Sequence, residues 1–125
     1  MMFLMRLPNP APGTIAAVHA AAAWFEKTRL ADVAYISKGD KGRQLVPEPG
    51  AAPLWARYYS LEADCPIFGD RDKTIHDDVS GISSERRNGY RWFTGGPMGA
   101  LQAYARWKVT HPPYGAHGAN PSSIL

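Results

Sequence analysis

The sequence predicts a mainly helical domain with short β elements. The chain has 125 residues, of which 45% are hydrophobic and 20% are charged. This composition is typical of one globular domain and not of a disordered chain. Three segments have the composition and apolar spacing of helices, at residues 14–30, 79–93 and 95–113. The runs between them are short and rich in turn residues, which favours small strands.

The alanine-rich segment "TIAAVHAAAAWFEKTRL", residues 14–30, is the strongest helix prediction. Alanine has the highest intrinsic helix propensity, and Thr14 is a suitable N-cap. Lys27 and Arg29 fall in the expected last turn, where the helix dipole favours cations. Apolar residues recur on one face at Ile15, Val18, Ala22 and Phe25. We expect this face to be buried, and we expect His19 to be a packed side chain.

The remaining elements are predicted to be shorter. Residues 33–37 and 42–50 have strand composition and flank the turn "KGDKG". The segment 79–93 is predicted to form a second helix that ends at Asn88-Gly89. A third helix is expected to start near Pro97, because proline is tolerated in the first turn.

The two ends of the chain have different compositions from its centre. Residues 1–13 contain three prolines and are predicted to form an extended arm, followed by a body at 14–111 and a loose tail at 112–125. The first five residues are apolar but are followed by Arg6, which does not match the order of an export signal. No segment has the roughly 20 apolar residues that span a bilayer. We therefore expect no membrane partner, and the compartment stays undetermined.

The stretch "PIFGDRDKTIHDDVS", residues 66–80, is rich in acidic side chains. Its possible metal ligands are Asp70, Asp72, His76, Asp77 and Asp78. A calcium loop counted from Asp70 would need glycine where Ile75 stands and glutamate where Gly81 stands. Two cations, Arg71 and Lys73, also alternate with the acids. We interpret the stretch as a turn whose aspartates cap backbone amides and pair with arginines.

Nucleophilic catalysis has little support in the sequence. Several serines and four histidines are present, but no G-x-S-x-G elbow surrounds any serine. Cys65 is the only cysteine and has no obvious base beside it, so we expect an inert thiol.

Arginine dominates the basic residues, with nine of the 14 Lys and Arg positions. Arg57 lies among aromatic residues, Arg71 lies in the acidic turn, and Arg86 and Arg87 precede "NGY". Guanidinium groups bind carboxylates bidentately, and aromatic rings beside them can stack on sugars. Ordinary salt bridges to acids such as Glu85 explain the same pattern. Both interpretations stay open on composition alone.

The strings "PLWAR", "PIFGDRD" and "ERRNGY" together resemble the C-terminal segment of the family 10 polysaccharide lyases, the pectate lyases. The resemblance extends over about 90 residues. It implies a fold that is the C-terminal part of an (α/α)3 toroid, and β-elimination of α-1,4-galacturonan with an arginine base and calcium. It implies that Arg57, Arg71 and Arg86 bind polygalacturonate or oligogalacturonate. Arg87 replaces Arg86 if the register is shifted by one residue.

The chain also departs from the family pattern. The resemblance implies that the catalytic arginine and the calcium ligands lie in upstream segments, so we assign no catalytic or metal residue here. We therefore expect the isolated chain to be inactive and its partner to be the N-terminal part of the lyase. Family members are typically secreted or periplasmic. The alternative function is a non-enzymatic module that binds acidic polysaccharide or, less favoured, nucleic acid.

Overall fold

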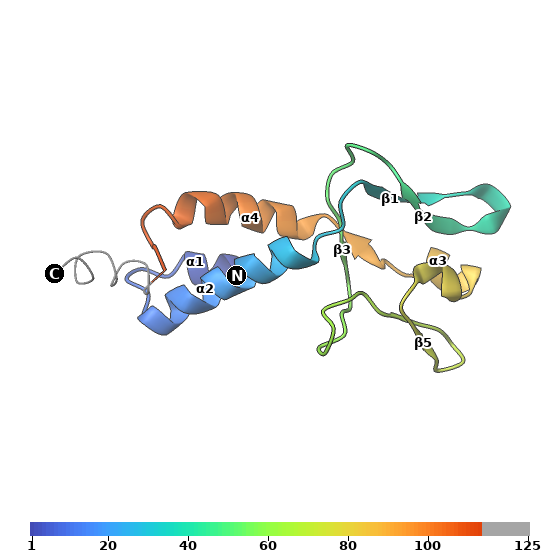
Figure 1. Cartoon of the computed structure of the whole chain (residues 1–125), viewed down its shortest axis with the longest axis horizontal. Helices are drawn as coiled ribbons and strands as arrows, with labels where there is room; N and C mark the ends of the chain where they lie inside the picture. The colour runs from blue at the N-terminus through green and yellow to red at the C-terminus, as the bar shows by residue number, and fades with distance from the viewer. Residues whose placement is uncertain (114–125) are drawn as a thin grey trace. The chain divides into compact units, whose positions relative to one another are not determined.

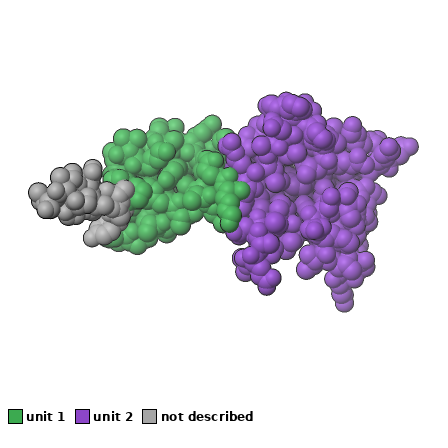
Figure 2. All heavy atoms as spheres, in the orientation of Figure 1, with its two compact units in different colours: residues 1–27, 97–125 green, residues 28–96 purple. Residues whose placement is uncertain are grey.

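A computed structural model describes residues 1–113 of the chain. The chain forms two compact units, which Figure 2 shows in different colours. The first consists of Met1–Lys27 together with the segment that begins at Pro97, and the second consists of Thr28–Gly96.

The first unit contains the helices α1 (Met2–Met5), α2 (Pro12–Thr28) and α4 (Gly96–Trp107). Helix α2 confirms the main helix prediction, but it begins at Pro12 and not after Thr14. Proline has a fixed φ and lacks an N–H, so it fits the first position of a helix. Val18 and Ala22 are buried on the predicted apolar face, and Leu101 and Trp107 are buried on α4. The segment 1–13, expected to be extended, includes the one-turn helix α1.

His19 joins α2 to α4, which run side by side in Figure 1. Its Nδ1 lies 2.7 Å from the Tyr104 hydroxyl, and its Nε2 lies 2.6 Å from the carbonyl oxygen of His111. The ring also contacts Trp107 at a centroid distance of 5.3 Å. The prediction that His19 is a packed side chain is therefore confirmed.

The second unit begins with a hairpin of β1 (Val33–Ser37) and β2 (Arg43–Pro47). The short 3-10 turn η1 (Gly39–Lys41) connects the two strands. Gly42 follows this turn with a φ of +74°, and a Cβ there would lie 2.9 Å from the side-chain oxygen of Asn88. Both the conformation and the close approach require glycine. The hairpin predicted around "KGDKG" is confirmed.

Two further pairs of very short strands complete this unit. Strand β3 (Trp55–Ala56) pairs with β6 (Phe93–Thr94), and β4 (Phe68–Gly69) pairs with β5 (Ile75–His76), both antiparallel. The 3-10 turn η2 (Val79–Gly81) and helix α3 (Ser84–Gly89) lie between β5 and β6 in sequence. The buried core of this unit consists of Ala56, Phe68, Val79, Ile82, Trp92 and Phe93.

The prediction of a mainly helical chain that forms part of an (α/α)3 toroid is wrong. Among residues 1–113, only α2, with 17 residues, and α4, with 12, exceed two turns. The helix predicted within 79–93 is reduced to the six residues of α3: it ends at Gly89 as predicted, but residues 79–81 form η2 instead of its first turn. Three separate two-stranded sheets organise the second unit instead. Long-range strand pairing has overridden local helix propensity there.

The length and apolar character of the described helices test whether any of them could span a membrane. None of those within residues 1–113 is long and apolar enough to cross a bilayer. The predicted loose tail lies almost wholly outside the described residues.

Candidate functional site

The acidic turn is held to the start of α3 by Asp70. One oxygen of its carboxylate accepts a hydrogen bond from the backbone N–H of Arg71 at 2.7 Å, and the other accepts from the N–H of Ser83 at 2.8 Å. The Ser83 hydroxyl donates a third bond at 3.0 Å. These bonds, led by that from Arg71, lower the pKa of Asp70. Asp70 thus ties the β4–β5 turn to the residue that caps α3.

The other aspartates of the turn make local bonds. Asp72 accepts from the backbone N–H of Thr74 at 3.0 Å, and Asp78 accepts from the N–H of Ser80 at 2.9 Å. Their pKa values are lowered by these contacts, for Asp72 chiefly by the Thr74 hydroxyl. The prediction that these aspartates cap backbone amides is confirmed. Within residues 1–113, no group of three or more acidic, histidine or cysteine side chains could hold a metal ion, so the described residues do not fit a calcium site.

Arg71 is paired with Glu85 of α3. Its Nε and one terminal nitrogen donate to the two carboxylate oxygens, both at 2.6 Å. The side chains are 68% and 60% exposed, so solvent screens the pair. The bond from Arg71 is the main reason that the pKa of Glu85 is lowered. Here the salt-bridge interpretation holds: an acid of the same surface neutralises this arginine.

Arg57 and Arg86 lie together on an aromatic ring. The guanidinium carbon of Arg57 is 5.0 Å from the centroid of the Tyr90 ring, and that of Arg86 is 5.5 Å from the same centroid. The two carbons therefore cannot be further apart than the sum of these distances. Within the described part of the chain, neither guanidinium forms an ion pair with an acidic side chain. The Nε of Arg86 is buried and has no hydrogen-bond partner there.

Arg87 has a different environment from Arg86. Its guanidinium donates to the backbone carbonyl oxygens of Arg43 at 2.9 Å and Lys41 at 2.8 Å, and also to that of Ile82. These bonds attach α3 to the turn between β1 and β2. The Arg87 guanidinium is therefore occupied by backbone carbonyls, whereas that of Arg86 lies against the rings of Tyr90 and Trp92.

The aromatic residues beside the two arginines are Tyr58, Tyr90 and Trp92. The rings of Tyr58 and Tyr90 are stacked at 6.2 Å, with their hydroxyl oxygens 2.6 Å apart. Together with Arg86 they border a mostly apolar cavity of about 260 Å³, which Phe68 and Ile75 also line. Trp55, one of the aromatic residues near Arg57 in the sequence, is only 1% exposed and so cannot offer its ring to a sugar. Tyr59 is half-buried, and its hydroxyl bonds the backbone of Ala56 and Thr28.

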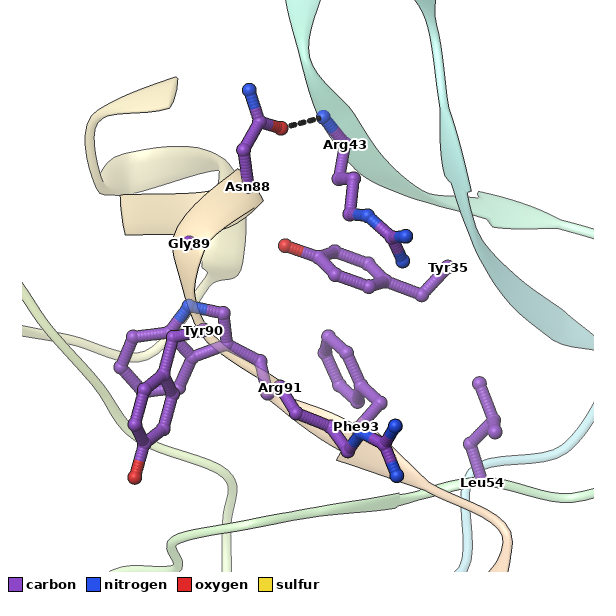
Figure 3. Close-up of a pocket in the computed structure, with 9 residues that line it drawn as sticks. Tyr35, Arg43, Leu54, Asn88, Gly89, Tyr90, Arg91 and Phe93 are labelled. Atoms are coloured by element: carbon purple, nitrogen blue, oxygen red, sulfur yellow. Dashed lines mark hydrogen bonds between the residues drawn. The ribbon is translucent and has the colours of Figure 1, made fainter. Parts of the chain in front are cut away.

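A second cavity, of about 360 Å³, lies on the hairpin side of α3 (Figure 3). Two of its polar side chains are occupied by hydrogen bonds within the chain. The Tyr35 hydroxyl donates to the carbonyl oxygen of Arg87 at 2.7 Å, and Asn88 accepts from the N–H of Arg43 at 2.7 Å. Burial raises the pKa of Tyr35. Arg43 and Arg91 also line this cavity, and the guanidinium carbon of Arg43 lies 5.9 Å from the centroid of the Tyr35 ring.

The sequence analysis missed Tyr90 and Tyr58 as members of the site. Tyr90 directly follows the "ERRNG" string, and Tyr58 directly follows Arg57. Their adjacency to the arginines was the available signal. Their mutual stacking was not visible, because 31 residues separate them in the sequence.

Comparison with known proteins places these residues in a family. A profile of the pectic acid lyase family matches residues 1–100. A solved family 10 polysaccharide lyase from Cellvibrio cellulosa is 31% identical, with a TM-score of 0.73. A single-residue mutant of a family 10 lyase from the same organism, in complex with trigalacturonic acid, is 32% identical with a TM-score of 0.72. No curated protein matches the chain.

The alignments to both lyase structures cover 83% of this chain and 32% of the lyase chain. The chain thus spans about a third of the length of those solved enzymes. The matching family profile, the shared fold and the identity above 30% agree with the resemblance of the three sequence strings. The chain belongs to the pectic acid lyase family.

Proposed function

We propose that this chain supplies the substrate-binding surface of a pectate lyase, and that Arg57, Arg71 and Arg86 bind the carboxylates of oligogalacturonate, with Arg57 and Arg86 as the main contacts. The observation that carries the proposal is the pair of guanidinium groups on the Tyr90 ring without an acidic partner in residues 1–113. Two unneutralised cations on one surface favour a ligand with repeated negative charges. The complex of a related lyase with trigalacturonic acid supports the choice of a uronate chain.

The chemistry of β-elimination gives these arginines a defined task. Removal of the proton at C5 of a uronate places negative charge next to its carboxylate. A guanidinium bound bidentately to that carboxylate stabilises the developing charge, because the donors are already in place. Arginine stays protonated throughout and so needs no proton exchange for this role.

The proposal assigns substrate binding to this chain and not the whole reaction. The family resemblance implies that the catalytic base and the calcium ligands belong to other parts of the lyase. We therefore expect the 125-residue chain to bind oligogalacturonate without cleaving it. The appearance of unsaturated uronate product, followed by its absorbance, would contradict this expectation.

Calorimetric titration with trigalacturonate tests the binding. Arg57→Lys and Arg86→Lys are each expected to weaken it about tenfold, because a point charge replaces a planar fork. Arg106→Lys is the matched control, since Arg106 lies in the last turn of α4 in the other unit. Binding that the two site variants leave unchanged would contradict the proposal.

A non-enzymatic polyanion-binding module is the competing function. A nucleic-acid binder would bind polyphosphates at least as tightly, with a steep loss of affinity as salt rises. Uronate recognition predicts that trigalacturonate binds better than other polyanions of equal charge. Equal affinity for both classes would favour the competing function.

A further inference from the structure

The ring of Tyr90 is shared by the two unneutralised arginines. Arg57 comes from the segment after β3, and Arg86 comes from α3, so the two approach the ring from different elements. Their guanidinium carbons lie 5.0 and 5.5 Å from its centroid. A cation within about 6 Å of an aromatic centroid is attracted by the electron-rich face of the ring. Tyr90 therefore contacts both charges at once.

Two arginine side chains normally move apart, because their charges have the same sign and their side chains are flexible. Arginine has several rotatable bonds, and two nearby guanidinium groups repel each other. Within residues 1–113 no acid pairs with Arg57 or Arg86, in contrast to Arg71. The Tyr90 ring attracts both side chains, and the guanidinium carbon of Arg86 also lies 5.6 Å from the centroid of the Trp92 ring. The Tyr90 ring offsets their repulsion without consuming the hydrogen-bond donors that a carboxylate needs.

Tyr90 is itself fixed by the core. Its ring contacts Trp92 at a centroid distance of 4.7 Å, and Trp92 is only 2% exposed. Trp92 also holds the main chain of both arginines. Its carbonyl oxygen accepts from the N–H of Arg57 at 2.8 Å, and its indole N–H donates to the carbonyl oxygen of Arg86 at 2.9 Å. Hydrogen bonds to Trp92 hold the backbone of both arginines, while both guanidinium groups contact the ring of Tyr90.

We propose that Tyr90 is a positioning residue for substrate, whose ring holds Arg57 and Arg86 as one preorganised receptor for uronate carboxylates. This inference rests on the proposed function and adds to it a residue that acts through the arginines and not by contact with the sugar. Preorganised donors lose less conformational freedom when the ligand binds. The electron density of the ring face, and not the Tyr90 hydroxyl, is the property that matters.

Substitution with fluorinated rings tests this role directly. Tyr90→Phe keeps the ring and removes only the hydroxyl that contacts Tyr58, so it is the reference for the fluorinated ring. Replacing Tyr90 with 3,4,5-trifluorophenylalanine keeps the shape but withdraws electron density from the ring face. We expect it to weaken binding about fivefold relative to Tyr90→Phe, at an unchanged melting temperature. Equal affinity of the phenylalanine and trifluorophenylalanine chains would overturn the inference.

A ligand-free measurement separates this inference from the proposed function. Ring currents of Tyr90 should shift the side-chain NMR signals of both Arg57 and Arg86. Tyr90→Leu should abolish the shift of Arg57 and reduce that of Arg86, which also contacts the Trp92 ring, while leaving the signals of Arg106 unchanged. Ring-current shifts with no trigalacturonate binding by the unmodified chain would overturn the proposed function. Binding without a response to fluorination would overturn the role of Tyr90 alone. Absence of the shifts in the unmodified chain would overturn the shared-ring geometry.

Discussion

Arg71 and the pair formed by Arg57 and Arg86 show two ways to place an arginine on the same unit. Arg71 is exposed and forms a bidentate salt bridge with Glu85 at 2.6 Å. Arg57 and Arg86 instead share the ring of Tyr90 and have no acidic partner among residues 1–113. A salt bridge uses the donors that would bind a carboxylate, whereas a ring leaves them free. Availability for a ligand therefore depends on the neighbour and not on the arginine itself.

The largest expected effect comes from Trp92, the buried residue that packs against Tyr90 and hydrogen-bonds the backbone of Arg57 and Arg86. Trp92→Ala removes a ring that is 2% exposed and is expected to lower the free energy of unfolding by about 3–5 kcal/mol, as for other buried aromatic residues. Chemical denaturation measures the change. Trp24→Ala is the control, because Trp24 is only half-buried. A loss smaller than that of Trp24→Ala would contradict a core role for Trp92.

Glu85→Gln is expected to leave Arg71 without an acidic partner, as Arg57 and Arg86 are within residues 1–113. Removing the negative charge frees the Arg71 guanidinium, so the affinity for trigalacturonate should rise about threefold, a modest change typical of an exposed pair. Arg71→Lys in the unmodified chain should have a smaller effect than Arg86→Lys, because Glu85 already occupies Arg71. Calorimetric titration of the three variants measures both differences. Glu62→Gln, elsewhere on the surface, serves as the charge-matched control. Weaker binding by Glu85→Gln would show that the salt bridge orients Arg71 for substrate.

The lowered pKa of Asp70 predicts that the stability of the folded chain depends on pH. Hydrogen bonds from the N–H groups of Arg71 and Ser83 lower the pKa of Asp70 in the folded chain. A carboxyl group with a lowered pKa contributes stability above its unfolded value of about 3.9, and this contribution is lost as the pH falls through the folded value. Asp70→Asn should therefore lower the melting temperature at pH 7, and the difference should vanish toward pH 2.

Asp77→Asn is the control for this experiment, since the Asp77 carboxylate forms no hydrogen bond among the described residues. Its melting temperature should follow that of the unmodified chain across the pH range. A constant difference between Asp70→Asn and the unmodified chain from pH 7 to pH 2 would contradict the assignment.

The smallest expected effect is an alkaline loss of binding at the Tyr90 region. The hydrogen bond from Tyr90 is the main cause that lowers the pKa of Tyr58, and Arg57 also contributes. As the pH rises through this lowered value, Tyr58 becomes an anion beside the two arginines and competes with substrate carboxylates. Tyr58→Phe should therefore retain trigalacturonate binding to higher pH than the unmodified chain. Titrations between pH 7 and pH 10 measure this, and identical profiles would contradict the competition.

Local patterns in the sequence determined several features of this protein. The alanine run predicted α2, and "KGDKG" predicted the hairpin turn. Three of the four aspartates of residues 66–80 cap nearby amides as expected. All of these depend on residues a few positions apart, whose hydrogen bonds and propensities are decided within the segment. The three arginine-containing strings likewise indicated the family that the comparisons established.

Only the tertiary structure decided which arginines remain available and which part of 79–93 is helical. Residues 79–81 form the turn η2 and not the start of the helix, and Phe93, at the end of this segment, pairs with Ala56 in β3, almost forty positions away. The same long-range packing assigns Arg87 to the carbonyls of the hairpin turn and Arg86 to the ring of Tyr90. Adjacent residues on a short helix point in different directions, so sequence proximity could not separate their roles. Charge and composition are properties of the sequence, but the partner of each guanidinium is set by how distant segments meet.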